Sequence, residues 1–238
     1  MSTDPWQLLG TARTVLAVHA HPDDESSQTS GAMARAAAEG HRVVVVFATN
    51  GEHGEVPDDL ADGETLVDRR RAEALRSAQV LGTARVAWLG YSDSGMTGWE
   101  QNSVAGNLHL ADLDEAGGRL AAILDEEDAD VLVTYDWHGG YGHPDHVKAH
   151  HVGHRGAELA ARRPRVLEST MNRDRMRAFH EAAIAAGQES DLDPDRPMDD
   201  GNPMGLPQSE IHHAVDVTEV IDVKRAALAC HASQSDVQ

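Results

Sequence analysis

Residues 14–26 read TVLAVHAHPDDES, an apolar run that ends abruptly in acidic and imidazole side chains. Its first part is rich in branched aliphatic residues and has no polar face, which is typical of a strand buried on both sides. Two histidines, two aspartates and a glutamate then fall within residues 19–25. Such groups avoid burial unless they are paired or bind a cation. The segment therefore predicts a central strand that delivers polar groups to one edge of a sheet.

Further apolar runs of the same kind alternate with stretches of helical periodicity. This alternation favours right-handed β-α-β units and a parallel sheet. We predict an α/β fold: a Rossmann-like three-layer sandwich whose mainly parallel sheet has the order 3-2-1-4-5 and helices on both faces. The ranges are 42–49, 85–91 and 130–135 for the strands and 26–39, 66–81 and 113–127 for the helices.

The second half of the chain continues this pattern less regularly. Residues 191–207 are rich in proline, glycine and aspartate and are expected to form an irregular loop. We expect residues 1–238 to form a single domain. Helices are predicted at 146–163, 173–187 and 219–231, and strands at 165–170 and, as an edge strand, at 212–218.

The charge balance excludes two classes of partner. Twenty Lys and Arg against forty Asp and Glu give a formal net charge of −20, which repels nucleic-acid phosphates and anionic lipid. No window approaches the roughly 20 apolar residues of a membrane span, and the N-terminus lacks a signal-peptide pattern. We expect a soluble, cytoplasmic protein with no nucleic-acid or membrane partner, and the sequence leaves a homo-oligomer open. The single cysteine, Cys230, is expected to be inert.

A second polar segment, YDWHGGYGHPDH at 135–146, follows the fourth predicted strand. The first and fourth strands are neighbours in the predicted order, so both polar segments should reach the crevice beyond their carboxyl ends. Histidine and aspartate are ligands of catalytic zinc, which takes three from the protein. The first segment offers His21 and Asp24, and the second offers His143 or His146. No GxGxxG follows the first strand, which argues against a dinucleotide.

Other histidines receive structural interpretations. His146, His150 and His154 recur at i, i+4 and i+8 and share one helix face. That spacing allows a second metal, but we favour support of the first site and a solvated polar face. His19 lies inside the first strand and is expected to be a hydrogen-bonded core residue.

Four motifs stand behind the first four strands: AHPDDE, TNGEHGE, GYSDSGM and GYGHPDH. Together they resemble the LmbE-like (PIG-L) family of zinc-dependent N-deacetylases over roughly residues 12–160. The motifs are most similar to the actinobacterial mycothiol branch, which contains a deacetylase of an N-acetylglucosaminyl-inositol precursor and an S-conjugate amidase. The resemblance implies that His21, Asp24 and His146 bind zinc, although iron(II) suits the same ligands. It also implies that Asp23 is the general base.

The resemblance implies roles for three more residues of the last motif. His143 would stabilise the oxyanion in its protonated form and give a proton to the leaving nitrogen. Tyr141 would assist at the carbonyl oxygen, and Asp145 would orient or tune His143. Such donors to a developing oxyanion contribute about 3–4 kcal/mol each where measured.

Glu52, Arg70 and Asp93 match positions that hold the sugar and its neighbour in the mycothiol enzymes. The expected activity is hydrolysis of an N-acyl, above all N-acetyl, amide on an amino-sugar derivative. One alternative is cleavage of a larger amide, as in the S-conjugate amidase. A non-haem iron(II) oxygenase uses the same ligand types but usually on β-barrels. A non-catalytic metal- or sugar-binding module would not need Asp23 beside the ligands.

Overall fold

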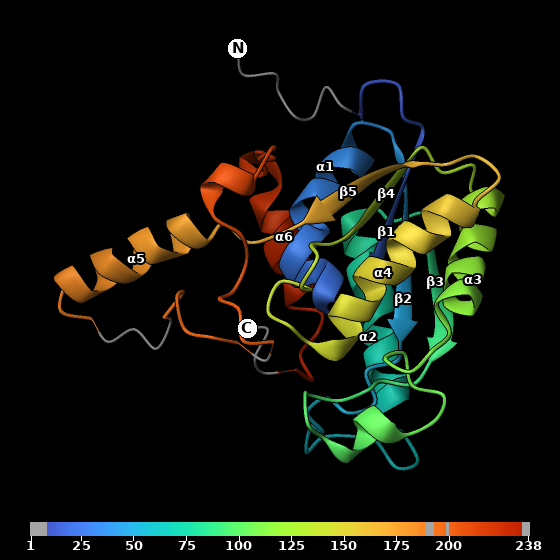
Figure 1. Ribbon diagram of the computed structural model, residues 1–238, viewed down its shortest axis with the longest axis horizontal. Coiled ribbons are helices and arrows are strands. Elements are labelled where there is room, and N and C mark those ends of the chain that lie inside the picture. The colour runs from blue at the N-terminus through green and yellow to red at the C-terminus, as the bar shows by residue number, and fades with distance from the viewer. Residues whose placement is uncertain (1–8, 189–192, 199, 235–238) are drawn as a thin grey trace.

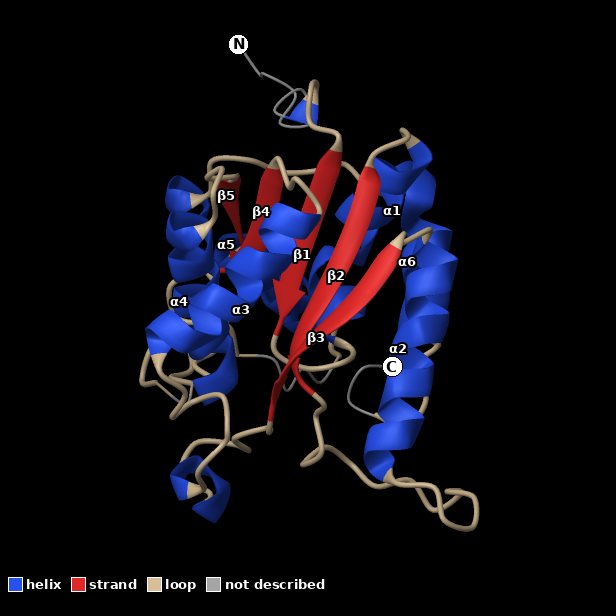
Figure 2. Cartoon of the chain, turned by 90° about the vertical axis from the view of Figure 1, so that its right-hand side faces the viewer, coloured by secondary structure: helices blue, strands red, loops and turns tan. Residues whose placement is uncertain are grey.

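The computed structural model describes residues 9–188, 193–198 and 200–234. At its centre lies a five-stranded sheet of order β3-β2-β1-β4-β5, and every neighbouring pair is parallel. Figure 2 shows these strands side by side between two layers of helices. The predicted fold class and strand order are confirmed. The strands are β1 (Thr14–His19), β2 (Arg42–Thr49), β3 (Arg85–Tyr91), β4 (Val131–Tyr135) and β5 (Arg165–Ser169).

Strand β1 is buried along its whole length because helices cover both faces of the sheet. Leu16 and Val18 belong to an apolar cluster with α3 and α4, whereas Val15 and Ala17 belong to one with α1, α2 and α6. The period of two along the strand thus divides one apolar run between two cores. The helices are α1 (Ser30–Ala38), α2 (Leu66–Leu81), α3 (Leu113–Glu126), α4 (Pro144–Leu159), α5 (Arg173–Ala185) and α6 (Ile221–Leu228).

Two helix starts place the polar segments. After β1 the chain enters a π-helical turn, Glu25–Thr29, before α1 begins. After β4 it makes a glycine-rich turn and enters α4 at Pro144, a residue suited to a first helical position. The His143 side chain caps this helix by accepting the backbone N–H of Asp145. Both polar segments are therefore fixed at the carboxyl ends of neighbouring strands.

The predicted edge strand at 212–218 is wrong. Its residues are mostly exposed and join no strand of the sheet. The segment runs over α1 instead, where Arg35 donates to the carbonyl oxygen of Asp216 at 3.1 Å and Val217 packs against Gly31. An edge strand needs a buried face and a neighbouring ladder, and this segment has neither.

In the rest of the second half, the observed helices differ in length and burial from a compact, regular pattern. Helix α5 buries none of its residues and extends away from the body of the molecule in Figure 1. Helix α6 is shorter than the predicted 219–231. In the predicted loop, 193–198 and 200–207 contain no helix or strand, while 191, 192 and 199 lie outside the described residues. Within the described parts, none of the helices combines the length and apolar character needed to span a bilayer.

Candidate active site

A cavity of about 500 Å³ opens beyond the carboxyl ends of the strands. His21 and Asp24 from the loop after β1, Asp93 from the loop after β3 and His143 from the loop after β4 contribute to its wall. This is the crevice that the strand order predicts, and its volume is typical of small-molecule sites. The structure therefore brings the distant polar segments together.

The three side chains with predicted metal-ligand roles form a compact cluster. One donor atom from each of His21, Asp24 and His146 lies within 4.8 Å of the others, and all three residues are buried. Nδ1 of His21 is 3.3 Å from Oδ2 of Asp24, and Nε2 of His146 is 3.2 Å from Oδ1 of Asp24. Two ligands bound tetrahedrally to one zinc at about 2.1 Å lie about 3.4 Å apart. The spacing fits a shared metal ion.

The contacts of the two ring nitrogens of His146 favour a cation beside it. Its Nδ1 lies 3.1 Å from the carbonyl oxygen of Gly139 and therefore carries the ring proton. Its Nε2 is buried and makes no hydrogen bond among the described residues. This nitrogen lies 3.2 Å from Oδ1 of Asp24, so the two atoms can share a cation, and a buried carboxylate needs such a partner. Metal-bound histidines commonly donate their other N–H to a carbonyl in this way.

A second candidate set shares one member with the first. Donor atoms of His21, Asp93 and His143 also lie within 4.8 Å of one another. Burial opposes protonation of His21, but Asp93, Asp145 and Asp24 outweigh it and raise its pKa well above the usual value. Burial would likewise raise the pKa of Asp93, but His21 and the Gly95 N–H hold that pKa well below its usual range. The crevice thus favours positive charge at its centre.

Asp23 stands beside the cluster without belonging to it. It lines the cavity, and its Oδ2 accepts from Nη2 of Arg70 at 2.8 Å. Burial, opposed by Arg70 and reinforced by Asp24, raises the pKa of Asp23 to about 6. A carboxylate with such a pKa can take up a proton near neutral pH.

The backbone of Asp23 is strained, with φ at 119° in a region that L-residues rarely adopt. Its N–H donates to Oε2 of Glu25 at 2.9 Å. The other oxygen of Glu25 accepts from Oγ of Ser77 at 2.6 Å and from Nε2 of His231 at 2.7 Å. Sequence reasoning missed this buried support, because Glu25 and His231 are 206 positions apart.

His143 is buried in the crevice wall beside the rings of His21 and His146. Burial, followed by His21 and His146, lowers the pKa of His143 to about 2. Its Nδ1 accepts the Asp145 N–H at 3.1 Å, so the neutral ring carries its proton on Nε2. The lowered pKa favours a neutral ring, whereas the resemblance implied a protonated one. Tyr141 lies in the same wall, with its ring centroid 6.2 Å from that of His143.

The carboxylate of Asp145 faces a different partner from the predicted one. Its Oδ2 is 3.3 Å from Nε2 of His21 and accepts the Ser94 N–H at 2.8 Å. Its Oδ1 accepts from Oγ of Ser94 at 2.5 Å. His143 contacts only the backbone N–H of Asp145, because the side chain points across the crevice toward the loop after β3. Asp145 therefore contacts His21 through its side chain, and Ser94, a member of the GYSDSGM motif with no predicted role, holds that carboxylate.

Tyr135, the last residue of β4, is another support that sequence reasoning missed. Its hydroxyl donates to Oδ2 of Asp24 at 2.7 Å and accepts the Ala20 N–H at 2.9 Å. The residue is 1% exposed, and a buried tyrosine hydroxyl needs such partners. A tyrosine at the carboxyl end of a central strand was the available signal.

The three predicted substrate-binding residues have different environments. Asp93 lines the cavity, whereas Glu52 is not part of its wall. Arg70 also lines it, but its guanidinium binds the carbonyl oxygens of Gly51 and Pro22 besides Asp23. Through these contacts Arg70 positions the loop that carries Asp23.

His19 and Cys230 both lie outside the cavity wall. His19 is buried, with Nε2 2.9 Å from Oγ1 of Thr29, so the hydrogen-bonded core role is confirmed. Burial raises the pKa of the Cys230 thiol, which disfavours the reactive thiolate.

Comparison with known proteins shows which proteins this chain is similar to. A family model described as PIG-L, GlcNAc-PI de-N-acetylase, matches residues 16–156. A 1D-myo-inositol 2-acetamido-2-deoxy-alpha-D-glucopyranoside deacetylase from Thermobispora bispora is 37% identical over 239 residues, covering 93% of this chain and 79% of that protein. The deacetylase of the same name from Streptomyces avermitilis is 50% identical over 159 residues, covering 63% of this chain. The match spans 54%, about half, of that relative's length.

Among solved structures, the N,N'-diacetylchitobiose deacetylase from Pyrococcus horikoshii has a TM-score of 0.63 with 24% identity, covering 99% of this chain and 76% of that one. This likeness shows a common fold, and a fold alone does not define a reaction. The family match covers more than half of the chain and includes the first and last polar segments. The chain belongs to the PIG-L (GlcNAc-PI de-N-acetylase) family.

Proposed function

We propose that this chain is a zinc-dependent amidohydrolase that removes the N-acetyl group from an amino-sugar derivative. The substrate that we infer is a GlcNAc-inositol glycoside, the compound for which its deacetylase relatives are named. One observation supports the proposal: Nε2 of His146, which makes no hydrogen bond among the described residues, lies 3.2 Å from Oδ1 of Asp24, directly beside Asp23. In the proposed site a cation would be held next to a carboxylate that is not one of its ligands.

His21, Asp24 and His146 would hold the cation. A divalent metal bound there would act as a Lewis acid on the acyl carbonyl and on the attacking water. Two imidazoles and one carboxylate are a common catalytic zinc set, and the same set suits iron(II). Tyr135 and the Gly139 carbonyl would keep two of these ligands in orientation.

Asp23 would activate the water. Arg70 binds one of its oxygens, which leaves Oδ1 to accept a proton as the water attacks. The pKa of about 6 keeps Asp23 ionised at neutral pH and makes proton uptake inexpensive. The proton then on Asp23 can pass to the amide nitrogen as the C–N bond breaks. The products are acetate and a free amine.

His143 and Tyr141 would stabilise the oxyanion. The neutral His143 offers its Nε2–H to the cavity because Nδ1 is held by the Asp145 backbone. Tyr141 can offer its hydroxyl from the same wall. A neutral donor stabilises negative charge without needing to be reprotonated in each turnover. Removing either donor should cost about 3–4 kcal/mol of transition-state stabilisation.

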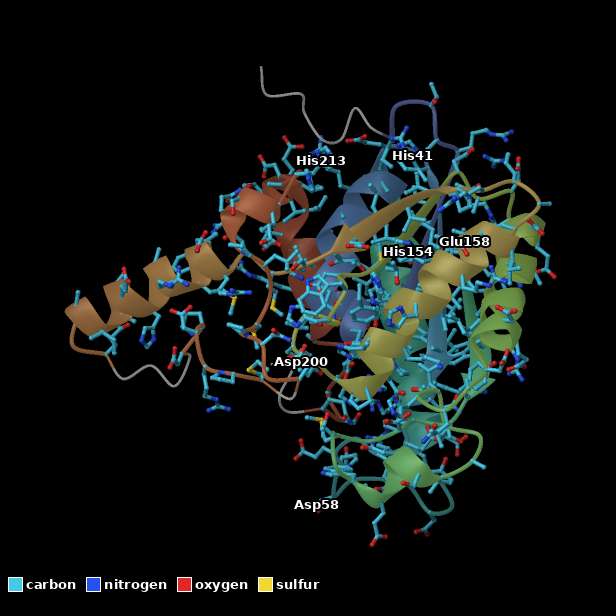
Figure 3. All side chains as sticks on the ribbon, viewed as in Figure 1. His41, Asp58, His154, Glu158, Asp200 and His213 are labelled. Atoms are coloured by element: carbon cyan, nitrogen blue, oxygen red, sulfur yellow. The ribbon has the colours of Figure 1, made fainter. Side chains whose placement is uncertain are left out.

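The test is hydrolysis of GlcNAc-inositol by the zinc-loaded chain, with the amine measured by fluorescence and acetate by a coupled assay. We expect equal amounts of both products. Asp23→Asn should keep its zinc but lose at least about a hundredfold in kcat, as loss of a general base does. His146→Ala should lose the zinc of this site. The matched control is Asp58→Asn, an exposed aspartate in the loop after β2, which should retain full activity (Figure 3).

Other results would redirect or end the proposal. Full activity in Asp23→Asn would remove Asp23 from the mechanism. Hydrolysis of a bulky mycothiol conjugate alone would favour the S-conjugate amidase reaction. Oxygen consumption with a 2-oxo acid would favour the oxygenase alternative, and zinc or sugar binding without any amine release would indicate a binding module.

A further inference from the structure

We propose that His150, His154 and Glu168 form a second site for a divalent transition metal, on the side of α4 that packs against β5. The site is separate from the catalytic cluster and does not depend on the proposed reaction. The helix spacing of the two histidines alone allowed several roles. The structure adds a carboxylate from a different element at the same place.

The three side chains have the spacing of a metal site. The ring centroids of His150 and His154, one helical turn apart, are 4.6 Å from each other. Oε1 of Glu168 is 2.8 Å from Nε2 of His154 and 3.6 Å from Nδ1 of His150. One donor atom from each residue lies within 4.8 Å of the other two. Two ligands on one zinc lie about 3.4 Å apart, so small side-chain rotations would bring all three to bonding distance.

The orientation of His150 supports a ligand role. Its Nδ1 lies 3.0 Å from the carbonyl oxygen of Tyr135, which can hold the ring proton on that nitrogen. A metal could bind Nε2 with this hydrogen bond kept, or it could bind Nδ1, the nitrogen that lies 3.6 Å from Glu168, in place of the carbonyl oxygen. A backbone carbonyl often orients a metal-bound histidine in this way. Tyr135 therefore contacts both sites, through its carbonyl oxygen here and through its hydroxyl at Asp24.

The surroundings suit a metal that arrives from solvent. The side chains of His154 and Glu168 are each 38% exposed, which gives an ion access and leaves coordination positions for water. Figure 3 marks His154 on α4. Within the described residues, Glu168 forms ion pairs only with the two histidines, so no lysine or arginine neutralises it there. Two imidazoles with one carboxylate select Zn²⁺, Co²⁺, Ni²⁺ or Cu²⁺ over Mg²⁺ and Ca²⁺.

The experiment counts zinc. The full chain, without a histidine tag, is dialysed against Zn²⁺ and analysed for bound metal. We expect two equivalents in the wild type and one in His154→Ala. The matched control is His151→Ala, a neighbouring exposed histidine outside the cluster, which should keep two equivalents. His146→Ala should retain one equivalent, and the double variant His146→Ala/His154→Ala should bind none.

Glu168→Gln provides a second variant that preserves the volume of the side chain. It should weaken the outer site about tenfold or more, a loss at the lower end of that seen when the surroundings of a metal ligand are altered. Equal amounts of zinc in His154→Ala and in the wild type would overturn the proposal, as would a loss in His151→Ala equal to that in His154→Ala. Loss of zinc in His146→Ala alone reports on the catalytic cluster, so failure of one site is distinguishable from failure of the other.

Discussion

Replacing His231 by alanine should destabilise the protein strongly, because the change removes a partner from a buried carboxylate. Glu25 is 1% exposed and His231 is 0% exposed. The imidazole Nε2 lies 2.7 Å from Oε1 of Glu25. Two donors would remain on Glu25: the Ser77 hydroxyl at 2.6 Å and the Asp23 N–H at 2.9 Å.

The magnitude follows from these contacts. Removing one member of a buried ion pair costs about 3–5 kcal/mol. Because two donors stay with the carboxylate, we expect the lower end, about 3 kcal/mol. For a urea dependence of about 3 kcal/mol per molar, the unfolding midpoint should fall by about 1 M. A typical domain has about 5–15 kcal/mol of stability, so the variant should still fold.

The loss should also depend on pH. Burial lowers the pKa of His231, but Glu25 outweighs burial and raises this pKa above the usual 6.5. Burial raises the pKa of Glu25, but His231 and Ser77 outweigh burial and lower this pKa below 4.5. The His231 contribution is complete below pH 6.5 and is lost as the pH rises through the raised value. The Glu25 contribution is complete above pH 4.5 and is lost as the pH falls through the lowered value. The difference from wild type should therefore be largest between these limits.

Urea unfolding followed by circular dichroism, at about pH 5.5 and about pH 9, measures both effects. The control is His213→Ala, an exposed histidine before α6, whose effect should stay within about 0.5 kcal/mol (Figure 3). His231→Gln can still donate a hydrogen bond and should recover part of the loss. A midpoint shift equal to that of the control, or a shift that grows at alkaline pH, would refute the reasoning.

Three other changes probe the catalytic cluster. Tyr135→Phe removes the donor to Asp24 and should weaken zinc binding about ten- to a hundredfold in a chelator competition; an unchanged affinity would contradict this role. Gly139→Ala should lose zinc and thermal stability, since its Cβ would lie 2.4 Å from Cβ of His146 at a φ of 67°. Gly140→Ala shares the strain of a positive φ, 78°, but its Cβ would meet only the Met171 methyl at 3.4 Å, so this variant should lose stability and keep its zinc. Finally, kcat/KM should fall as the pH drops below about 6, because Asp23 then binds a proton; a pH–rate profile without that limb would exclude this assignment.

The sheet could be predicted because burial on both faces leaves a signal in the sequence. Strands such as TVLAVHA and RVVVVFAT are nearly continuous apolar runs, and their alternation with helices restricts the topology. The strand prediction for 212–218 is wrong because short β-branched stretches also occur in exposed chain that packs on a helix. Its position over α1 depends on Val217 fitting against Gly31, a contact that no local pattern encodes.

The metal-ligand candidates could be predicted because the strand order brings two polar segments to one crevice. The individual hydrogen-bond partners of these side chains could not be predicted. Asp145 begins a helix turn, and whether its carboxylate reaches His143 or His21 depends on the direction of that helix and on Ser94 from another loop. The charge state of His143 depends on burial and on neighbouring imidazoles, which become known only when all the loops are placed.

The central position of β1 also sets the order of events during synthesis. His21 leaves the ribosome early, but Asp145 beside it is 124 positions later, and His231, which braces Glu25, is 206 positions after that glutamate. At a translation rate of about 5–20 residues per second, His231 is synthesised about 10–40 s after Glu25, the residue with which it pairs beside the strained turn at Asp23. A nascent chain would thus complete this turn late, and a prematurely terminated product lacking His231 would leave the buried Glu25 without one of its partners.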